Sequence, residues 1–348
     1  MADFGQELIE KVHQQLKIDE QWTTRLDRSF SWIGHRLEQT ISSPTPVQDG
    51  EFTLYKLKAE TVVVDSVTAS ENTVNQILSE LNQHSFGNCY SFDKSESRIY
   101  ATTSTWIHKE TAGWRSNMFD LYAIGQLCMA EAEADFLAKK CLGIVALKSH
   151  PISGQREKPD DMLNVIDDLI IPKGQEPSLY QDAFEFEAVA DTTKTTDRVA
   201  TLGSSADGIA LESSFDNYTA ISVLSSTYKH RLLGSGLSIR LQIPTPFIQD
   251  DGYRISAMLN RHELNNGHIG GQGHIGAWCV DQSPAGNSAI TYKSFLPNLV
   301  HLNGLIMDTS MACISRMRWV DQIMNQKPSK ESAWKRLAKR LGKDTDEE

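Results

Sequence analysis

The segment Gly271–Gly276 reads GQGHIG and matches G-x-G-x-x-G, the spacing of a dinucleotide-binding turn. That turn needs a strand before it and a helix after it, because the amides at the start of the helix face the pyrophosphate. Here YRISAMLNRHEL precedes the glycines and predicts a helix, whereas AWCVD follows them and predicts a strand. The flanking elements are reversed, so we predict neither a nucleotide site nor any other cofactor.

Three histidines surround the same segment. His262, His268 and His274 are spaced H-x5-H-x5-H, with Glu263 next to the first. Neutral imidazoles are good ligands for zinc or nickel, so a metal-binding or catalytic protein centred on residues 262–276 is one hypothesis. The simpler interpretation is a glycine-rich loop with exposed histidines. The sequence has no G-x-S-x-G and no phosphate-binding G-x-x-x-x-G-K-[ST], and we therefore predict that the chain is not an enzyme.

Aromatic side chains mark two predicted hairpins. The first hairpin carries Tyr90, Tyr100 and Trp106, and the second carries Trp278 and Tyr292. Successive side chains of a strand point to opposite faces, so some of these rings are expected in the core and others outside it. An outward-facing set would form an aromatic patch suited to a partner polypeptide.

Composition limits the class of protein. Hydrophobic residues make up 40% and charged residues 23% of 348 residues, which is typical of a globular chain with a sizeable core. The net charge of −11 repels phosphate backbones, so nucleic-acid binding would need a local basic patch. No apolar run is long enough to span a membrane, and the first residues do not resemble a secretory signal. Five cysteines without C-x-x-C suit buried thiols, and we expect a cytoplasmic location.

The chain divides by pattern into five parts. Two amphipathic stretches, one over 4–16 and one with apolar residues from Ile18 to Ile41, predict an N-terminal helical arm over 1–44. A first domain over 45–145, a proline-rich linker over 146–177 and a second domain over 178–325 follow. Residues 326–348 combine a basic amphipathic helix with an acidic end, and they offer a second alternative, an accessory protein that contacts nucleic acid.

The second domain repeats the order of the first. A short helix, a hairpin and a long helix recur, with GNCYSFD matched by IGAWCVD and RIYATTSTW matched by SAITYKSFL. Such repetition predicts a tandem duplication and an α+β fold in which each domain packs an antiparallel sheet with helices. On this alignment GHIGGQGHIG is the enlarged loop that enters the first hairpin strand of the second copy.

This order of elements resembles the YbjN and type III secretion chaperone-like superfamily, in which such domains occur in tandem. The resemblance implies a small α/β sandwich, pairing of two domains, and binding of protein segments without catalysis. The pairing is expected either between two copies or between the two domains of one chain. We therefore predict a non-enzymatic protein-binding module, chaperone- or adaptor-like, that holds a partner polypeptide.

Overall fold

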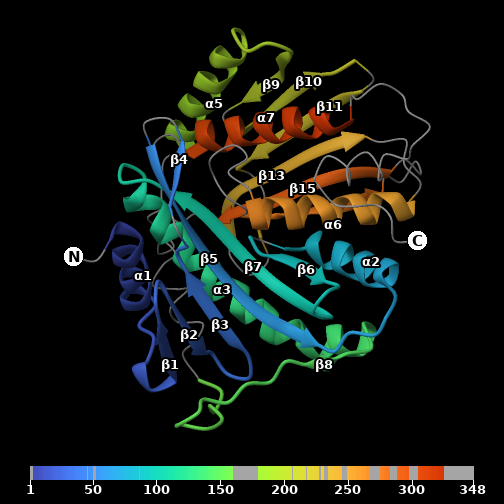
Figure 1. Ribbon diagram of the computed structural model, residues 1–348. Helices are drawn as coiled ribbons and strands as arrows, with labels where there is room; N and C mark the ends of the chain where they lie inside the picture. Colours follow the sequence, from blue (N-terminus) through green and yellow to red (C-terminus); the bar gives the residue numbers. More distant parts are fainter. Residues whose placement is uncertain are drawn as a thin grey trace. The chain divides into compact units, whose positions relative to one another are not determined.

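The computed structural model describes residues 3–44, 46–49, 52–85, 87–159, 179–205, 207–216, 218–226, 229–230, 234–244, 249–266, 275–282, 288–297 and 305–324. The chain forms two compact units (Figure 1). Unit 1 comprises residues 1–78, 87–172 and 273–275, and unit 2 comprises residues 79–86, 173–272 and 276–348.

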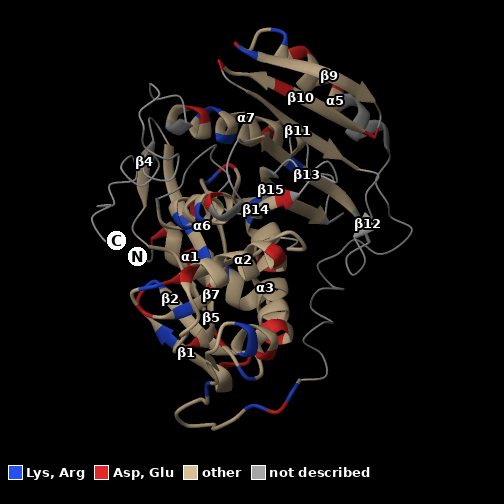
Figure 2. Cartoon of the chain, turned by 90° about the vertical axis from the view of Figure 1, so that its right-hand side faces the viewer, with Lys and Arg blue, Asp and Glu red and all other residues tan. Residues whose placement is uncertain are grey.

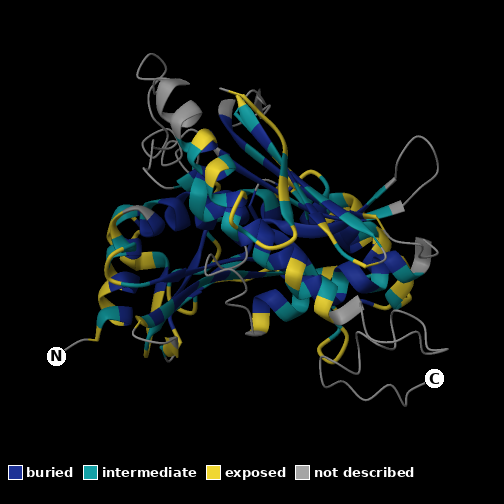
Figure 3. Ribbon diagram, turned by 90° about the horizontal axis from the view of Figure 1, so that it is seen from above, coloured by how far each residue is buried: buried dark blue, intermediate teal, exposed yellow. Residues whose placement is uncertain are grey.

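The first half of the chain builds an antiparallel sheet that packs against helices. Its elements are α1 (Phe4–Gln15), the 3-10 turn η1 (Glu20–Trp22), β1 (Thr23–Leu26), β2 (Ser29–Ile33), β3 (Glu38–Ser42), β4 (Val47–Asp49), β5 (Phe52–Asp65), α2 (Glu71–Asn82), β6 (Cys89–Asp93), β7 (Arg98–Ile107), α3 (Ala112–Lys140) and β8 (Ile144–Val145). The sheet order is β1-β2-β3-β5-β7-β6, and β4 and β8 also pair with β5. Helices α1 and α3 pack on β5, α3 also packs on β7, and buried residues run through the sheet (Figure 3).

The second half builds a sheet of the same kind. Its elements are α5 (Leu179–Thr193), β9 (Val199–Ser205), β10 (Gly208–Ser214), β11 (Thr219–Ser225), β12 (Lys229–His230), β13 (Gly234–Pro244), α6 (Gln249–Asn266), β14 (Ala277–Gln282), β15 (Ser288–Pro297) and α7 (Leu305–Met324). The sheet order is β9-β10-β11-β13-β15-β14, with β12 on β13. Helix α5 packs on β9 and β10, α7 on β11 and β13, and α6 on β14 and β15.

The two halves share one topology. Each begins with a helix, continues with strands that pair in chain order, and then adds a helix, a hairpin and a closing helix. In each sheet the second strand of the hairpin inserts beside the long strand before it, and the first strand takes the edge. The mixed α+β class with antiparallel sheets is therefore confirmed, and this shared order is what the predicted duplication requires.

The predicted helix over the second amphipathic stretch is wrong. Residues 18–41 contain β1, β2 and most of β3 instead. Apolar residues in short strands joined by tight turns also recur every three or four positions, so their spacing imitates a helix. A two-residue turn, with Arg28 at φ +53°, joins β1 to β2 and resets the alternation. Most of the apolar positions are buried as expected, but Leu26 is 59% exposed.

The remaining predicted elements fare better. The short helix is confirmed as α2, where Ser70 caps the first turn by accepting from Thr73 N at 3.3 Å. Both hairpins and both long helices are present. Before α2 the chain forms one long strand, β5, whose register with β7 shifts between Val62 and Val64. Helix α5 and strand β9 have no predicted counterpart. The basic helix predicted over 327–343 lies outside the described residues.

A buried ion pair joins α6, which packs on β14 and β15, to α7, which packs on β11 and β13. Glu263 of α6 and Arg316 of α7 are each 2% exposed, and Arg316 Nε donates to Glu263 Oε1 at 3.0 Å. The same carboxylate oxygen accepts from Trp278 Nε1 at 3.2 Å, and the guanidinium lies 4.2 Å from the centre of the Tyr292 ring. Side chains from two neighbouring strands, β14 and β15, therefore hold the ion pair in place.

None of the helices within the described ranges is long and apolar enough to cross a membrane.

Replacing Arg316 by Met is expected to lower the free energy of unfolding by about 3–5 kcal/mol, because Glu263 is left charged and buried. The double variant Glu263→Gln/Arg316→Met is expected to lose much less, since no uncompensated charge remains. Urea unfolding of both variants measures the difference. Arg198→Met is the matched control, because Arg198 forms an exposed pair with Asp216 at 3.7 Å and contributes little. Equal losses in the single and double variants would contradict this role for the pair.

Candidate functional site

The end of the glycine-rich segment lies where β14 begins. Gly276 has φ +134°, a backbone conformation that residues other than glycine rarely adopt. A Cβ at this position would collide with the carbonyl oxygen of Lys293 on β15. The residue therefore serves the close approach of two strands, and a strand rather than a helix follows it. This arrangement lacks the helix N-terminus that a dinucleotide-binding turn uses.

Only one of the three histidines of the metal hypothesis, His262, lies within the described residues. His268 and His274 lie outside the described residues. His262 lies on α6, half-buried, and its ring stacks on Trp319 with 5.0 Å between ring centres and 24° between planes. Burial lowers the pKa of His262, with Glu263 acting in the opposite direction. In the part of the chain that the structure describes, no group of three or more His, Cys, Asp or Glu residues is placed to hold a metal ion.

Four of the five hairpin aromatics lie in the core, so these four do not form an outward-facing aromatic patch. The side chains concerned are all 5% exposed or less, namely Tyr90, Trp106, Trp278 and Tyr292. Trp278 and Tyr292 are register partners on β14 and β15, and their rings meet edge to face at 5.4 Å under α6 and α7. Large rings bury the most apolar surface, so packing takes them into the core.

Two residues of the first hairpin and its neighbouring strand, Tyr100 and Lys56, have shifted pKa values. Tyr100 is half-buried and donates to Glu96, and burial together with this carboxylate raises its pKa to about 12. Trp106 is covered by Lys56, whose Nζ lies 5.7 Å from the ring centre. Burial, helped by Lys58, lowers the pKa of Lys56 to about 8. Sequence reasoning missed Lys56 because a lysine at an alternating strand position normally faces water.

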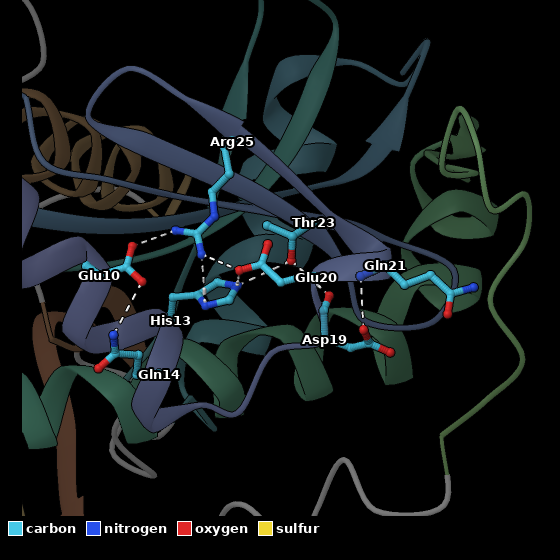
Figure 4. A network of polar contacts seen from close by, with 8 residues as sticks. All are labelled: Glu10, His13, Gln14, Asp19, Glu20, Gln21, Thr23 and Arg25. Atoms are coloured by element: carbon cyan, nitrogen blue, oxygen red, sulfur yellow. Dashed lines mark hydrogen bonds and ion pairs between the residues drawn. The ribbon is translucent and has the colours of Figure 1, made fainter.

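A polar network at the start of unit 1 surrounds a buried histidine (Figure 4). His13 of α1 is 5% exposed. Its Nδ1 lies 3.2 Å from Arg25 Nη2, and its Nε2 lies 3.4 Å from Thr23 Oγ1. Arg25 of β1 also donates to Glu10 Oε2 at 2.8 Å and to Glu20 Oε1 at 2.6 Å. The network ties α1 to the first strand of the sheet.

The donors around His13 determine its tautomer. Arginine is always protonated and only donates, so Nδ1 of His13 must accept and Nε2 must carry the proton. Nε2 then donates toward Thr23 Oγ1, and that hydroxyl donates to the backbone oxygen of Asp19 at 3.0 Å. A histidine that activates a hydroxyl must accept from it instead. The network therefore joins elements and does not form a nucleophile with its base.

The edges of the two sheets differ in how far they are protected. An edge strand presents unpaired N–H and C=O groups, and proteins protect it with charges, short length or covering groups. Strand β1 is four residues long and carries Arg25. On β14, Trp278 N donates to Asn260 Oδ1 at 2.7 Å, and Asn260 Nδ2 donates to Trp278 O at 2.8 Å. The buried amide of Asn260 thus occupies the place of a neighbouring strand.

Among the described residues, strand β9 lacks the charge and the amide cap of the other two edges, although a bulge at Leu202 interrupts its register with β10. Among the described strands it pairs only with β10, so its other side is an edge. Its sequence VATLGSS has neither charge nor proline, and most of its residues are exposed, including Leu202 at 54%. Figure 2 shows β9 without charged residues along its length. This seven-residue edge can accept an added strand.

The sheet face beside β9 continues the same character. Helix α5 covers one face, where Thr193 Oγ1 lies 2.7 Å from Thr201 Oγ1. On the other face, the register aligns Gly203 with Ala210 and Val223, and Val223 is 39% exposed. The next residue in this row is Arg240 on β13, which pairs with Asp281. The outer face is therefore uncharged in this row near β9 and charged beyond β11. We call the β9 strand with Ala210 and Val223 the β9 surface.

The free energy of unfolding is expected to fall as the pH is lowered from about 8 to about 5. The reason is that burial, and to a lesser extent the charge of Arg25, lowers the pKa of His13 in the folded state. The unfolded chain, with histidine pKa values near about 6.5, takes up the proton first and is favoured. His13→Gln keeps an acceptor for Arg25 and a donor for Thr23, so it should remove part of this slope. His262→Gln should remove a further part. Urea midpoints across this pH range test both, and an unchanged slope in the double variant would contradict the assignment.

The chain matches no family model, no curated protein and no solved structure.

Proposed function

We propose that the chain is a non-enzymatic protein-binding module, chaperone- or adaptor-like, that holds an extended segment of a partner polypeptide on the β9 surface. The observation that carries the proposal is the uncharged edge of β9, seven residues long and paired on one side only among the described strands. Adding a strand to such an edge satisfies its free backbone groups, and this supplies affinity without catalytic residues.

The neighbouring side chains support the same use. Leu202 and Val223 are exposed apolar residues, and burying them under a partner gives hydrophobic stabilisation. The uncharged character of β9 also suits apolar or polar partner residues better than charged ones. The resemblance to the YbjN and type III secretion chaperone-like superfamily, whose domains bind protein segments, agrees with this proposal.

The alternatives have weaker support. The metal hypothesis has one described histidine, His262, and this ring stacks on Trp319. The nucleic-acid hypothesis depends on the C-terminal basic segment, which lies outside the described residues. Neither is favoured by a specific contact.

The proposal is tested by selecting displayed random peptides of about twelve residues on the immobilised full chain. Enriched peptides are expected to alternate β-branched and small residues. Their affinity should drop by about tenfold or more in Leu202→Lys/Ser204→Lys, because two lysines on the edge oppose an added strand. Leu26→Lys is the matched control, since Leu26 is an exposed leucine on β1, the edge strand of the other sheet.

Two results would overturn the proposal. One is that no peptide is enriched over an unrelated immobilised protein. The other is that binding weakens equally in the β9 variant and in Leu26→Lys.

A further inference from the structure

A carboxyl group of unit 1 is buried without a hydrogen-bond partner. Asp120 of α3 is fully buried, and neither of its carboxyl oxygens has a partner among the described residues. Buried polar groups are normally hydrogen-bonded, because leaving them unpaired costs free energy. Burial accordingly raises the pKa of Asp120 well above its usual range. The protonated, neutral form is therefore the one that suits this position.

Helix α1 covers the face of α3 on which Asp120 lies. Ser116 and Asn117 precede Asp120 by four and three positions, so the three residues share one face of the helix. Lys11 Nζ of α1 donates to Ser116 Oγ at 2.7 Å, and Gln15 Nε2 of α1 donates to Asn117 Oδ1 at 3.0 Å. Undocking of α1 would therefore open this face of α3, with Asp120, to water.

Lys11 supplies the charge that acts on Asp120. Among the described residues it is the only one whose charge shifts the pKa of Asp120, and its lowering effect is smaller than the raising effect of burial. Its Nζ bonds Ser116 and does not bond either carboxyl oxygen of Asp120. A negative charge on Asp120 is thus only partly compensated while α1 is docked.

The sheet beneath α3 adds no charge to this site. Thr61 Oγ1 of β5 lies 3.3 Å from Gln126 Oε1 of α3, and this contact marks the face of β5 that the helix covers. Side chains alternate along a strand, so the charged neighbours of Thr61 point to the opposite face, namely Lys56, Lys58 and Glu60. Tyr55 is the titratable residue of β5 on the covered face, and its ring meets Phe4 of α1. Strand β8 and the covered face of β7 have no charged residue.

We propose that Asp120 is a pH-dependent switch that keeps α1 docked on α3 while it is protonated and releases α1 when it ionises. The inference is independent of the proposed function, because it concerns unit 1 whereas β9 belongs to unit 2. In the open state Asp120 meets water, and its pKa returns to about 3.9. Docking of α1 is therefore strongest below that pH and weakens as the pH rises toward the higher pKa of the docked state.

Release of α1 changes the surface of unit 1. Leu8, Ile9 and Val12 of α1 are each 4% exposed or less, and the helix packs on β5 and β2 as well as on α3. Undocking uncovers this apolar face and the surface beneath it. His13 on the same helix acts in the opposite direction, because burial lowers its pKa and its protonation disfavours the folded state at low pH. Together the two groups favour docking of α1 at intermediate pH.

Hydrogen exchange of the α1 amides tests the switch in the full-length His13→Gln chain, where the opposing histidine is absent. Between about pH 4 and about pH 8, the protection of residues 4–15, corrected for intrinsic exchange, should fall by up to about tenfold for each pH unit, because opening releases one proton. Adding Asp120→Asn, which is neutral and of similar shape, should abolish this fall. Adding Asp135→Asn instead is the matched control and should leave it unchanged, since Asp135 is a 72% exposed carboxylate of the same helix.

A second measurement covers the case in which Asp120→Asn does not fold. The carboxyl carbon of Asp120, followed by ¹³C NMR in the chain without substitutions, should titrate well above about pH 3.9. Titration near that value overturns the switch, as does α1 exchange in His13→Gln that does not depend on pH. A fall that persists with Asp120→Asn also overturns it. Equal losses of protection in α1, β5 and β7 would do the same, because the whole unit and not α1 then opens.

Discussion

A β-sheet leaves hydrogen-bonding groups unpaired at its edges. In unit 2 the two edge strands, β14 and β9, differ in how far these groups are covered. At β14 the buried amide of Asn260 bonds both backbone groups of Trp278, and Glu263, which pairs with Arg316 of α7, accepts from the indole N–H of the same residue. A charged pair in the core is stable only when every partner is in place. This end of the sheet is therefore fixed, whereas β9 at the other end has few contacts beyond β10 and α5.

The two halves reach the same topology with different chemistry. In unit 2 an ion pair joins the closing helix to α6, whereas in unit 1 neutral amides join the closing helix to the sheet, in addition to the Arg36–Glu131 pair. Gln39 Nε2 of β3 donates to the backbone oxygen of Ala123 on α3 at 2.7 Å, and Gln126 Nε2 of α3 donates to Ala101 O on β7 at 3.0 Å. Both solutions satisfy buried polar groups between a helix and a sheet. The two halves thus share a topology although different polar groups join helix to sheet in each.

The same comparison explains which edge is open. In unit 1 the first strand, β1, carries Arg25, and its guanidinium links Glu10 and Glu20 around His13. In unit 2 the corresponding first strand, β9, carries no charged residue. The network in Figure 4 therefore has no counterpart along β9. The first strands of the two sheets thus differ in charge, and the uncharged one is the edge on which the proposed function rests.

Local sequence determined the fold class, the hairpins, the capped helix α2 and the long helices, because each depends on contacts between residues near in the chain. It also identified Ile18, Phe30, Ile33 and Ile41 as core residues, since burial follows apolar character in either conformation. It could not distinguish a helix from short strands over 18–41, because in this segment apolar residues recur every three or four positions in either structure. Nor could it say which aromatic residues face the core, because this depends on the helices that cover the sheet. Only the tertiary structure decided that β9 is an edge, since an edge is defined by which strand is missing beside it and not by the strand's own residues.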